Sequence, residues 1–124
     1  MGAFMNPIFP VMAGGAIGAA LRYLASLALA GRSSFPFGTL AVNLIGGFAM
    51  GLLAALVLRG VASEGVRLFV GVGILGGFTT FSAFSLESFQ MIERGQMAMA
   101  AGYALASVIG SIAALAIGYA VARA

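Results

Sequence analysis

Four long apolar stretches dominate this sequence. They extend over roughly residues 8–30, 39–58, 66–91 and 96–121, and the second contains no charged residue. A transmembrane helix needs about 20 apolar residues, because each residue advances the helix by about 1.5 Å and the hydrocarbon core is about 30 Å thick. Each stretch is long enough to cross a bilayer once. We therefore predict an all-α integral membrane protein with four transmembrane helices, forming a single transmembrane domain over residues 1–124.

Charged residues are too few for a soluble domain. Only 7% of the 124 residues are charged, six arginines and three glutamates, whereas soluble domains carry about a quarter. The absence of cysteine and histidine excludes thiol catalysis, zinc sites built from these ligands and Ser-His-Asp triads. The arginines stand singly in apolar sequence, so the net charge of +3 forms no basic patch for nucleic acid. We expect neither an enzyme nor a nucleic-acid-binding protein.

The first apolar stretch differs from a signal peptide. It lacks a basic n-region and is longer than a usual h-region, so we expect it to belong to the mature fold. A multi-pass membrane protein without a targeting sequence is expected in the inner membrane of a bacterium, surrounded by lipid.

The six arginines divide evenly between the two sides of the membrane. With four spans, one side receives Arg59, Arg67 and Arg123. The other receives Arg32, Arg94 and, if it snorkels outward from the end of the first span, Arg22. An equal count gives the positive-inside rule no preferred orientation. This parity predicts dual topology and makes an antiparallel homodimer possible; the alternative is a weak bias set by the insertion machinery. Four short helices also enclose too little space for a wet pathway, and a second copy would supply the missing walls.

Small residues recur four positions apart in every span. The pairs are Gly14 with Gly18, Gly47 with Gly51, Gly73 with Gly77, and Gly110 with Ala114. Such pairs let helix backbones approach closely. For each pair we expect packing inside one chain in preference to contact between two copies.

The third stretch is poor helix material at its centre. Gly76 and Gly77 are adjacent and are followed by Thr79 and Thr80, which lowers helix propensity. We predict a break near residues 76–80. One interpretation is an ion site made of freed backbone carbonyls, since broken helices at membrane depth line polar cavities. The other is a tightly packed helix whose hydroxyls bond to carbonyls one turn earlier.

Three phenylalanines follow at helical spacing. Phe81 and Phe84 share one face beyond the break, and Phe78 extends the row backwards. Such a row is typical of plain packing. An aromatic ring also has a positive edge, however, so rings presented edge-on can partly replace water around a small anion. A channel needs a site that binds this weakly.

Polar side chains inside the spans are the remaining candidates. Asn43 lies within the second stretch, where its amide can donate to an anion or bond across helices. A hydroxyl stripe follows one face of the fourth stretch, able to line a path or to join helices, and consists of Tyr103, Ser107 and Ser111. Arg22 and Glu87 are the charges nearest hydrocarbon, and either can snorkel to the interface.

These motifs together resemble the Fluc (CrcB) family of small fluoride channels. The most specific matches are Gly-Thr-Leu-Ala-Val-Asn at residues 38–43 and Gly-Gly-Phe-Thr-Thr-Phe-Ser-Ala-Phe-Ser-Leu-Glu at residues 76–87. Looser matches lie at residues 14–23 and 110–111, so the resemblance extends over most of the chain. The sequence departs from the family at Ala83, where Thr or Ser is common, and at Leu115, where some members carry a hydroxyl.

The resemblance implies an antiparallel, dual-topology homodimer with two pores that conduct fluoride passively out of the cell. It implies that the backbone carbonyls of Gly76 and Thr79 from both copies hold a central structural Na⁺. It places Phe81 and Phe84 along the pores and makes Asn43 a fluoride donor. It further implies a polar pore lining formed by Tyr103, Ser107 and Ser111. By the same resemblance, Arg22 lies in the entry vestibule.

Two other kinds of protein share parts of this pattern. A small antiparallel multidrug exporter has four helices and similar length, but such transporters need a titratable acid in the first helix, where this sequence has none. Glu87 is the only acid near the membrane, at the end of the third stretch. A non-catalytic assembly or anchor subunit would leave Asn43, the broken helix and the hydroxyl stripe unexplained.

Overall fold

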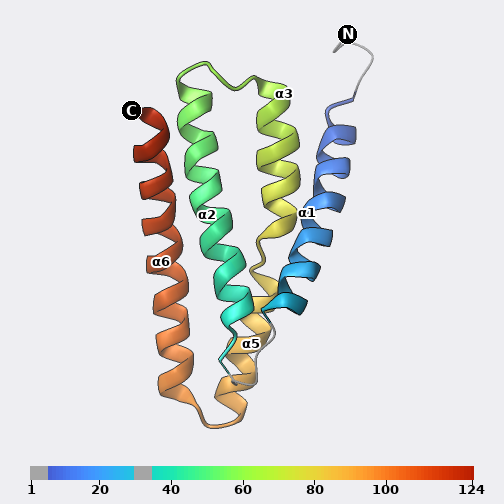
Figure 1. Ribbon diagram of the computed structural model, residues 1–124. Helices are drawn as coiled ribbons and strands as arrows, with labels where there is room; N and C mark the ends of the chain where they lie inside the picture. The colour runs from blue at the N-terminus through green and yellow to red at the C-terminus, as the bar shows by residue number, and fades with distance from the viewer. Residues whose placement is uncertain (1–5, 30–34) are drawn as a thin grey trace.

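The computed structural model describes residues 6–29 and 35–124, and all regular structure in these ranges is helical (Figure 1). Three helices are continuous: α1 (Ile8–Ala28), α2 (Phe37–Leu58) and α6 (Met97–Arg123). The remaining span is assembled from four segments, α3 (Glu64–Val66), the π-helix η2 (Arg67–Leu75), α4 (Gly76–Phe78) and α5 (Ser82–Glu93). Four helical units, taking Glu64–Glu93 as one, are long and apolar enough to cross a membrane. The prediction of four transmembrane helices is confirmed.

The helix ends differ little from the expected stretches. The third unit begins and ends two residues outside residues 66–91, and the fourth extends to Arg123. The end of the first stretch, at residue 30, and Arg32 of the arginine count lie outside the described residues.

The helices form two closely packed pairs. In Figure 1, α6 runs beside α2 along most of its length, whereas α1 packs against η2 and α4. α1 has little direct contact with α2. α5 continues the third span below the break and packs on α6, so the broken span connects the two pairs.

Glycine allows the backbones to touch within each pair. A Cβ added at Gly73 would lie 2.9 Å from the Cα of Gly14, and one at Gly47 would lie 2.9 Å from the carbonyl oxygen of Ser111. Gly18, Gly51 and Gly77 likewise face backbone of the neighbouring helix. The expectation of packing inside one chain is confirmed for both members of three small-residue pairs, those at 14/18, 47/51 and 73/77. Gly110 of the fourth pair also packs inside the chain, but against the side chain of Leu44 and not against backbone.

The third span is broken slightly later than expected. Gly76 and Gly77 are still helical, whereas Thr79 is extended, with φ −84° and ψ 159°, and helix resumes at Ser82. The segment before the break, Arg67–Leu75, is a π-helix that the sequence did not predict. Tertiary contacts explain both differences, because η2 and α4 lie against α1 and the backbone of Thr80 is held by a side chain of α2.

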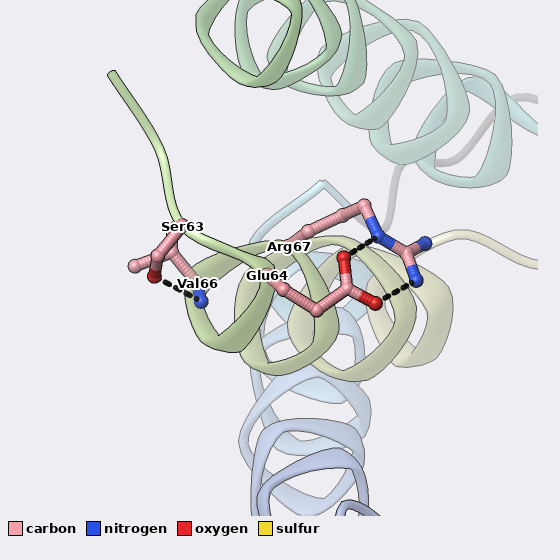
Figure 2. Close-up of polar contacts among 4 residues, drawn as sticks. All are labelled: Ser63, Glu64, Val66 and Arg67. Atoms are coloured by element: carbon pink, nitrogen blue, oxygen red, sulfur yellow. Dashed lines mark hydrogen bonds and ion pairs between the residues drawn. The ribbon is translucent and has the colours of Figure 1, made fainter. Parts of the chain in front are cut away.

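Short turns set the ends of the spans. Gly60 and Gly95 follow α2 and α5 with φ of 75° and 77°, the left-handed conformation that favours glycine after a helix. At the start of the third span, the Ser63 hydroxyl caps the helix by accepting a bond from the Val66 N–H at 3.2 Å. Glu64 and Arg67 form a bidentate ion pair there, both bonds being 2.8 Å (Figure 2). This pair is exposed and contributes little stability.

Candidate functional site

The break frees backbone groups that lie at membrane depth, where no water satisfies them. Asn43 of α2 satisfies two of these groups at once. Its Nδ2 donates to the carbonyl oxygen of Thr80 at 3.0 Å, and its Oδ1 accepts from the N–H of Thr80 at 2.8 Å. The amide therefore makes the interhelical bond that was one of the two interpretations of Asn43. A primary amide has a second N–H, which remains for another acceptor.

Arg22 of α1 reaches the break from the other side. Its Nε donates to the carbonyl oxygen of Gly77 at 3.1 Å, and the contact is partly buried. Gly77 is in the last helical turn before the break, where a carbonyl has lost its usual partner. Arg22 thus binds the backbone of the third span through Nε, while its two terminal nitrogens are not engaged in this bond, so snorkelling of the guanidinium head stays a prediction.

Two carbonyls at the break keep no partner. Among the described residues, no donor bonds to the backbone oxygen of Gly76 or of Thr79. The hydroxyl of Thr79 donates to the Leu75 carbonyl at 3.0 Å, and that of Ser85 donates to the Phe81 carbonyl at 3.0 Å. The freed carbonyls and the back-bonded hydroxyls, which were posed as alternatives, therefore occur together.

An open groove of about 440 Å³ lies beside the break, between α2, α5 and α6. Of the nine residues to which the family resemblance gives a role, seven line it, namely Asn43, Gly76, Thr79, Phe81, Phe84, Ser107 and Ser111. Apolar side chains such as Met50 and Ile112 form much of the remaining wall. The groove is thus an apolar channel-like surface with a few polar groups placed along it.

The two phenylalanines of the groove stand close together. The ring centroids of Phe81 and Phe84 are 5.5 Å apart, with the ring planes tilted by 39°. Phe81 is 78% exposed in the single chain, so its ring projects from the protein beside the groove. Phe78 lies on the far side of the break, close to Gly46 of α2, and does not line the groove.

The hydroxyl stripe of α6 is divided between two environments. Ser107 is 8% exposed and lines the groove, yet its hydroxyl has no hydrogen-bond partner among the described residues. Ser111 also lines the groove and is half-buried. Tyr103 is fully buried outside the groove lining, and its hydroxyl donates to Glu87 at 2.9 Å.

Glu87 is the centre of a small polar cluster. Its second carboxylate oxygen accepts a bond of 2.8 Å from the hydroxyl of Thr39, so both oxygens are engaged inside the protein. Glu87 therefore bonds to both α2 and α6, and its position relative to the membrane interface stays a prediction. The three cluster residues each lie one helical turn from a groove residue: Thr39 from Asn43, Glu87 from Phe84, and Tyr103 from Ser107. On each of the three helices, the cluster residue thus lies one turn beyond a groove residue, so polar side chains continue past the end of the groove.

Comparison with known proteins identifies the family. Residues 9–119 match the family described as CrcB-like protein, Camphor Resistance (CrcB). The chain belongs to the CrcB family. This confirms the resemblance read from the motifs, and with four apolar spans it makes the protein a multi-pass membrane protein.

Several bacterial relatives of this CrcB protein are named "Fluoride-specific ion channel FluC". The relative from Sphingopyxis alaskensis is 53% identical over 113 residues, which cover 89% of this chain and 90% of that protein. The relative from Mesorhizobium japonicum is 53% identical over 116 residues, with 91% and 93% covered. The relative from a Caulobacter species is 53% identical over 124 residues, with 96% of each chain covered.

Sequence reasoning missed two parts of the CrcB site. Thr39 was not singled out, although it lies four residues before Asn43 and so shares its helix face. The engagement of Arg22 and Glu87 inside the protein was also missed, because their partners are 55 and 48 residues away in the sequence. Helix spacing could have found Thr39, whereas no local pattern carries the other contacts.

Proposed function

We propose that this protein is a fluoride-specific ion channel that lets fluoride leave the cell passively and so protects the cell from it. The observation that carries the proposal is the 53% identity, over nearly whole chains, to relatives that bear this name. An ion channel catalyses no reaction, and the protein is not an enzyme. Fluoride is the transported ion, and we place the protein in the bacterial inner membrane.

The groove supplies the chemistry that a small anion needs. The second N–H of Asn43 and the unpartnered hydroxyl of Ser107 are donors without a competing acceptor in the described residues. The ring edges of Phe81 and Phe84 would replace water with weak, positive contacts. We assign Ser111 and Tyr103 to the same polar lining, and Arg22 to the entry, where its remaining guanidinium N–H groups carry positive charge.

A second, antiparallel copy would close the groove. In one chain the groove is open, and Phe81 and Gly76 at its edge are exposed. Two copies related in this way would form two equivalent pores, each with walls from both chains. The even arginine count, with Arg22 at the end of the first span included, supports the same arrangement, because it gives the positive-inside rule no preferred orientation. Accessibility mapping of a terminal tag should find both orientations in the membrane, and a single orientation would refute the antiparallel dimer.

The two free carbonyls of the break suit a sodium ion. Unwound backbone carbonyls are common Na⁺ ligands in membrane proteins. Gly76 and Thr79 would supply one pair of carbonyl oxygens from each copy. The bound ion would balance the partial negative charge of these oxygens, which the break leaves without a donor. The oxygens fit this group because no donor among the described residues occupies them.

The first experiment is ion release from proteoliposomes. The liposomes are loaded with fluoride and chloride, valinomycin is supplied to balance charge with potassium, and both anions are followed with ion-selective electrodes. We expect rapid release of fluoride with chloride retained. Equal release of both anions, or no fluoride release from a folded dimer, would refute the proposal. Uptake that requires a proton gradient would instead indicate the small multidrug exporter. Such an exporter needs a free acidic side chain in the membrane, whereas the carboxylate of Glu87 already accepts two hydrogen bonds.

A further inference from the structure

Arg22 makes a contact that attraction of an anion does not require. It bonds to the backbone at the break through Nε, the nitrogen within the side chain, and not through the terminal nitrogens. Its acceptor, the Gly77 carbonyl, lies at the carboxyl end of the helical segment that precedes the break. A positive charge and an N–H donor both stabilise this end of a helix.

The backbone around Gly77 is held against α1 without intervening side chains. A Cβ at Gly77 would lie 2.6 Å from the carbonyl oxygen of Gly15, and one at Gly18 would lie 2.9 Å from the backbone nitrogen of Phe78. Arg22 follows Gly15 and Gly18 on the same face of α1, at spacings of seven and four residues. The arginine is therefore the next contact along this face after the glycines, and the first that is polar.

The Gly77 carbonyl lies between the two free carbonyls in the sequence. Gly76 immediately precedes Gly77, and Thr79 follows two residues later. A bond that fixes the orientation of the Gly77 peptide also restricts the peptides on either side of it. Asn43 holds Thr80 in the same way from α2, so the segment that carries both free oxygens is fastened at two points.

We propose that Arg22 is a positioning residue: through its Nε bond to the Gly77 carbonyl it orients the Gly76 and Thr79 carbonyls and thereby sets their affinity for Na⁺. This inference rests on the Na⁺ site of the proposed function. It assigns to the Nε–H a role that is separate from the charge of the guanidinium.

Two substitutions separate the donor from the charge. In Arg22→Met the charge is lost and a methyl group, which donates no hydrogen bond, stands at the position of Nε. In Arg22→Gln the charge is lost as well, but the amide nitrogen occupies the same position along the side chain as Nε and can still donate. Arg59→Met is a matched control, because Arg59 donates to a backbone carbonyl, that of Ala122, far from the break in the sequence and exposed.

The measurement is the thermal unfolding midpoint of the purified protein as a function of Na⁺ concentration, with N-methylglucamine keeping the ionic strength constant. A bound ion stabilises the folded protein by RT ln(1 + [Na⁺]/Kd), so the concentration at which the midpoint begins to rise reports Kd without any flux. We expect Arg22→Met to raise this concentration by about tenfold or more, the effect of losing one charge-assisted bond. Arg22→Gln and Arg59→Met should stay within about twofold of the unsubstituted protein, a difference well below that of one such bond.

The other outcomes overturn the inference. A normal Na⁺ response in Arg22→Met, or a weakened one in Arg22→Gln, would show that the Nε donor does not set the affinity. If Arg22→Met does not fold, the Gln variant still decides, because it must keep the normal response. An unsubstituted protein that is indifferent to Na⁺ would refute the sodium site together with this inference, whereas selective fluoride release would still stand as a separate result.

Discussion

Replacement of Asn43 by leucine tests whether the amide of Asn43 stabilises the backbone at the break. Leucine has nearly the same size but no polar atom, so Asn43→Leu removes both hydrogen bonds to Thr80, of 3.0 and 2.8 Å. The N–H and carbonyl of Thr80 then have no partner at membrane depth. An orphaned buried group costs about 1–3 kcal/mol. Two such groups give a loss of about 2–4 kcal/mol in the free energy of unfolding if part of the segment relaxes.

Ser107→Ala is the matched control for this prediction. Ser107 is a polar residue of the same groove, but its hydroxyl has no partner among the described residues, so its removal leaves no group unsatisfied. We expect a change within about 0.5 kcal/mol. For comparison, an average hydrogen bond between membrane helices is worth only about 0.6 kcal/mol, so the loss of two average bonds in Asn43→Leu would lower the free energy of unfolding by about 1.2 kcal/mol.

Reversible unfolding in mixed detergent micelles, followed by circular dichroism, measures both variants. A loss in Asn43→Leu that is no larger than that in Ser107→Ala would refute the reasoning, because the amide would then contribute nothing to the break. The fluoride path adds a second readout. Both variants should conduct fluoride more slowly, since each removes a proposed donor, but only the leucine variant should also be destabilised.

Three further predictions concern packing, the acidic cluster and the pore. Gly18→Ala places a Cβ against backbone of the third span and should cost about 3 kcal/mol or prevent folding, whereas Gly15→Ala, with open space around its Cβ, should be neutral or stabilising in thermal unfolding. Tyr103→Phe leaves one oxygen of the partly buried Glu87 carboxylate without its donor and should lower the free energy of unfolding by about 1.5–3 kcal/mol; an unchanged unfolding midpoint would contradict this bond. Phe81→Ile should reduce fluoride release from liposomes by orders of magnitude while the dimer persists, and Phe89→Ile, on the same helical unit outside the groove lining, should release fluoride normally.

The sequence predicted the parts of the fold that the membrane itself dictates. A span of about 20 apolar residues has few alternatives in lipid, because backbone groups must be satisfied within the helix. The break was also predicted, since Gly76, Gly77, Thr79 and Thr80 are weak helix formers in a row. Its position was displaced toward residues 79–81, where Asn43 binds Thr80.

The features that the sequence did not predict depend on contacts between distant segments. The π-helix of η2 lies where backbone packs directly on backbone of α1, and no local composition signals that geometry. For Arg22 and Glu87 the sequence indicated only that either charge can snorkel to the interface. Their partners are a freed carbonyl and two hydroxyls brought close only by the fold.

The direct backbone contact within each helix pair has a mechanical consequence. Packed side chains can change rotamer and absorb a displacement, but where α1 meets η2 and where α2 meets α6 there is no such layer at the glycines. Each pair should therefore move as one stiff body, and thermal fluctuation should be concentrated along the seam between them. The Asn43–Thr80 bonds cross that seam, because they join α2 to the break of the third span. A movement of the two pairs that widens or narrows the groove therefore strains these hydrogen bonds first, and the bonds oppose it.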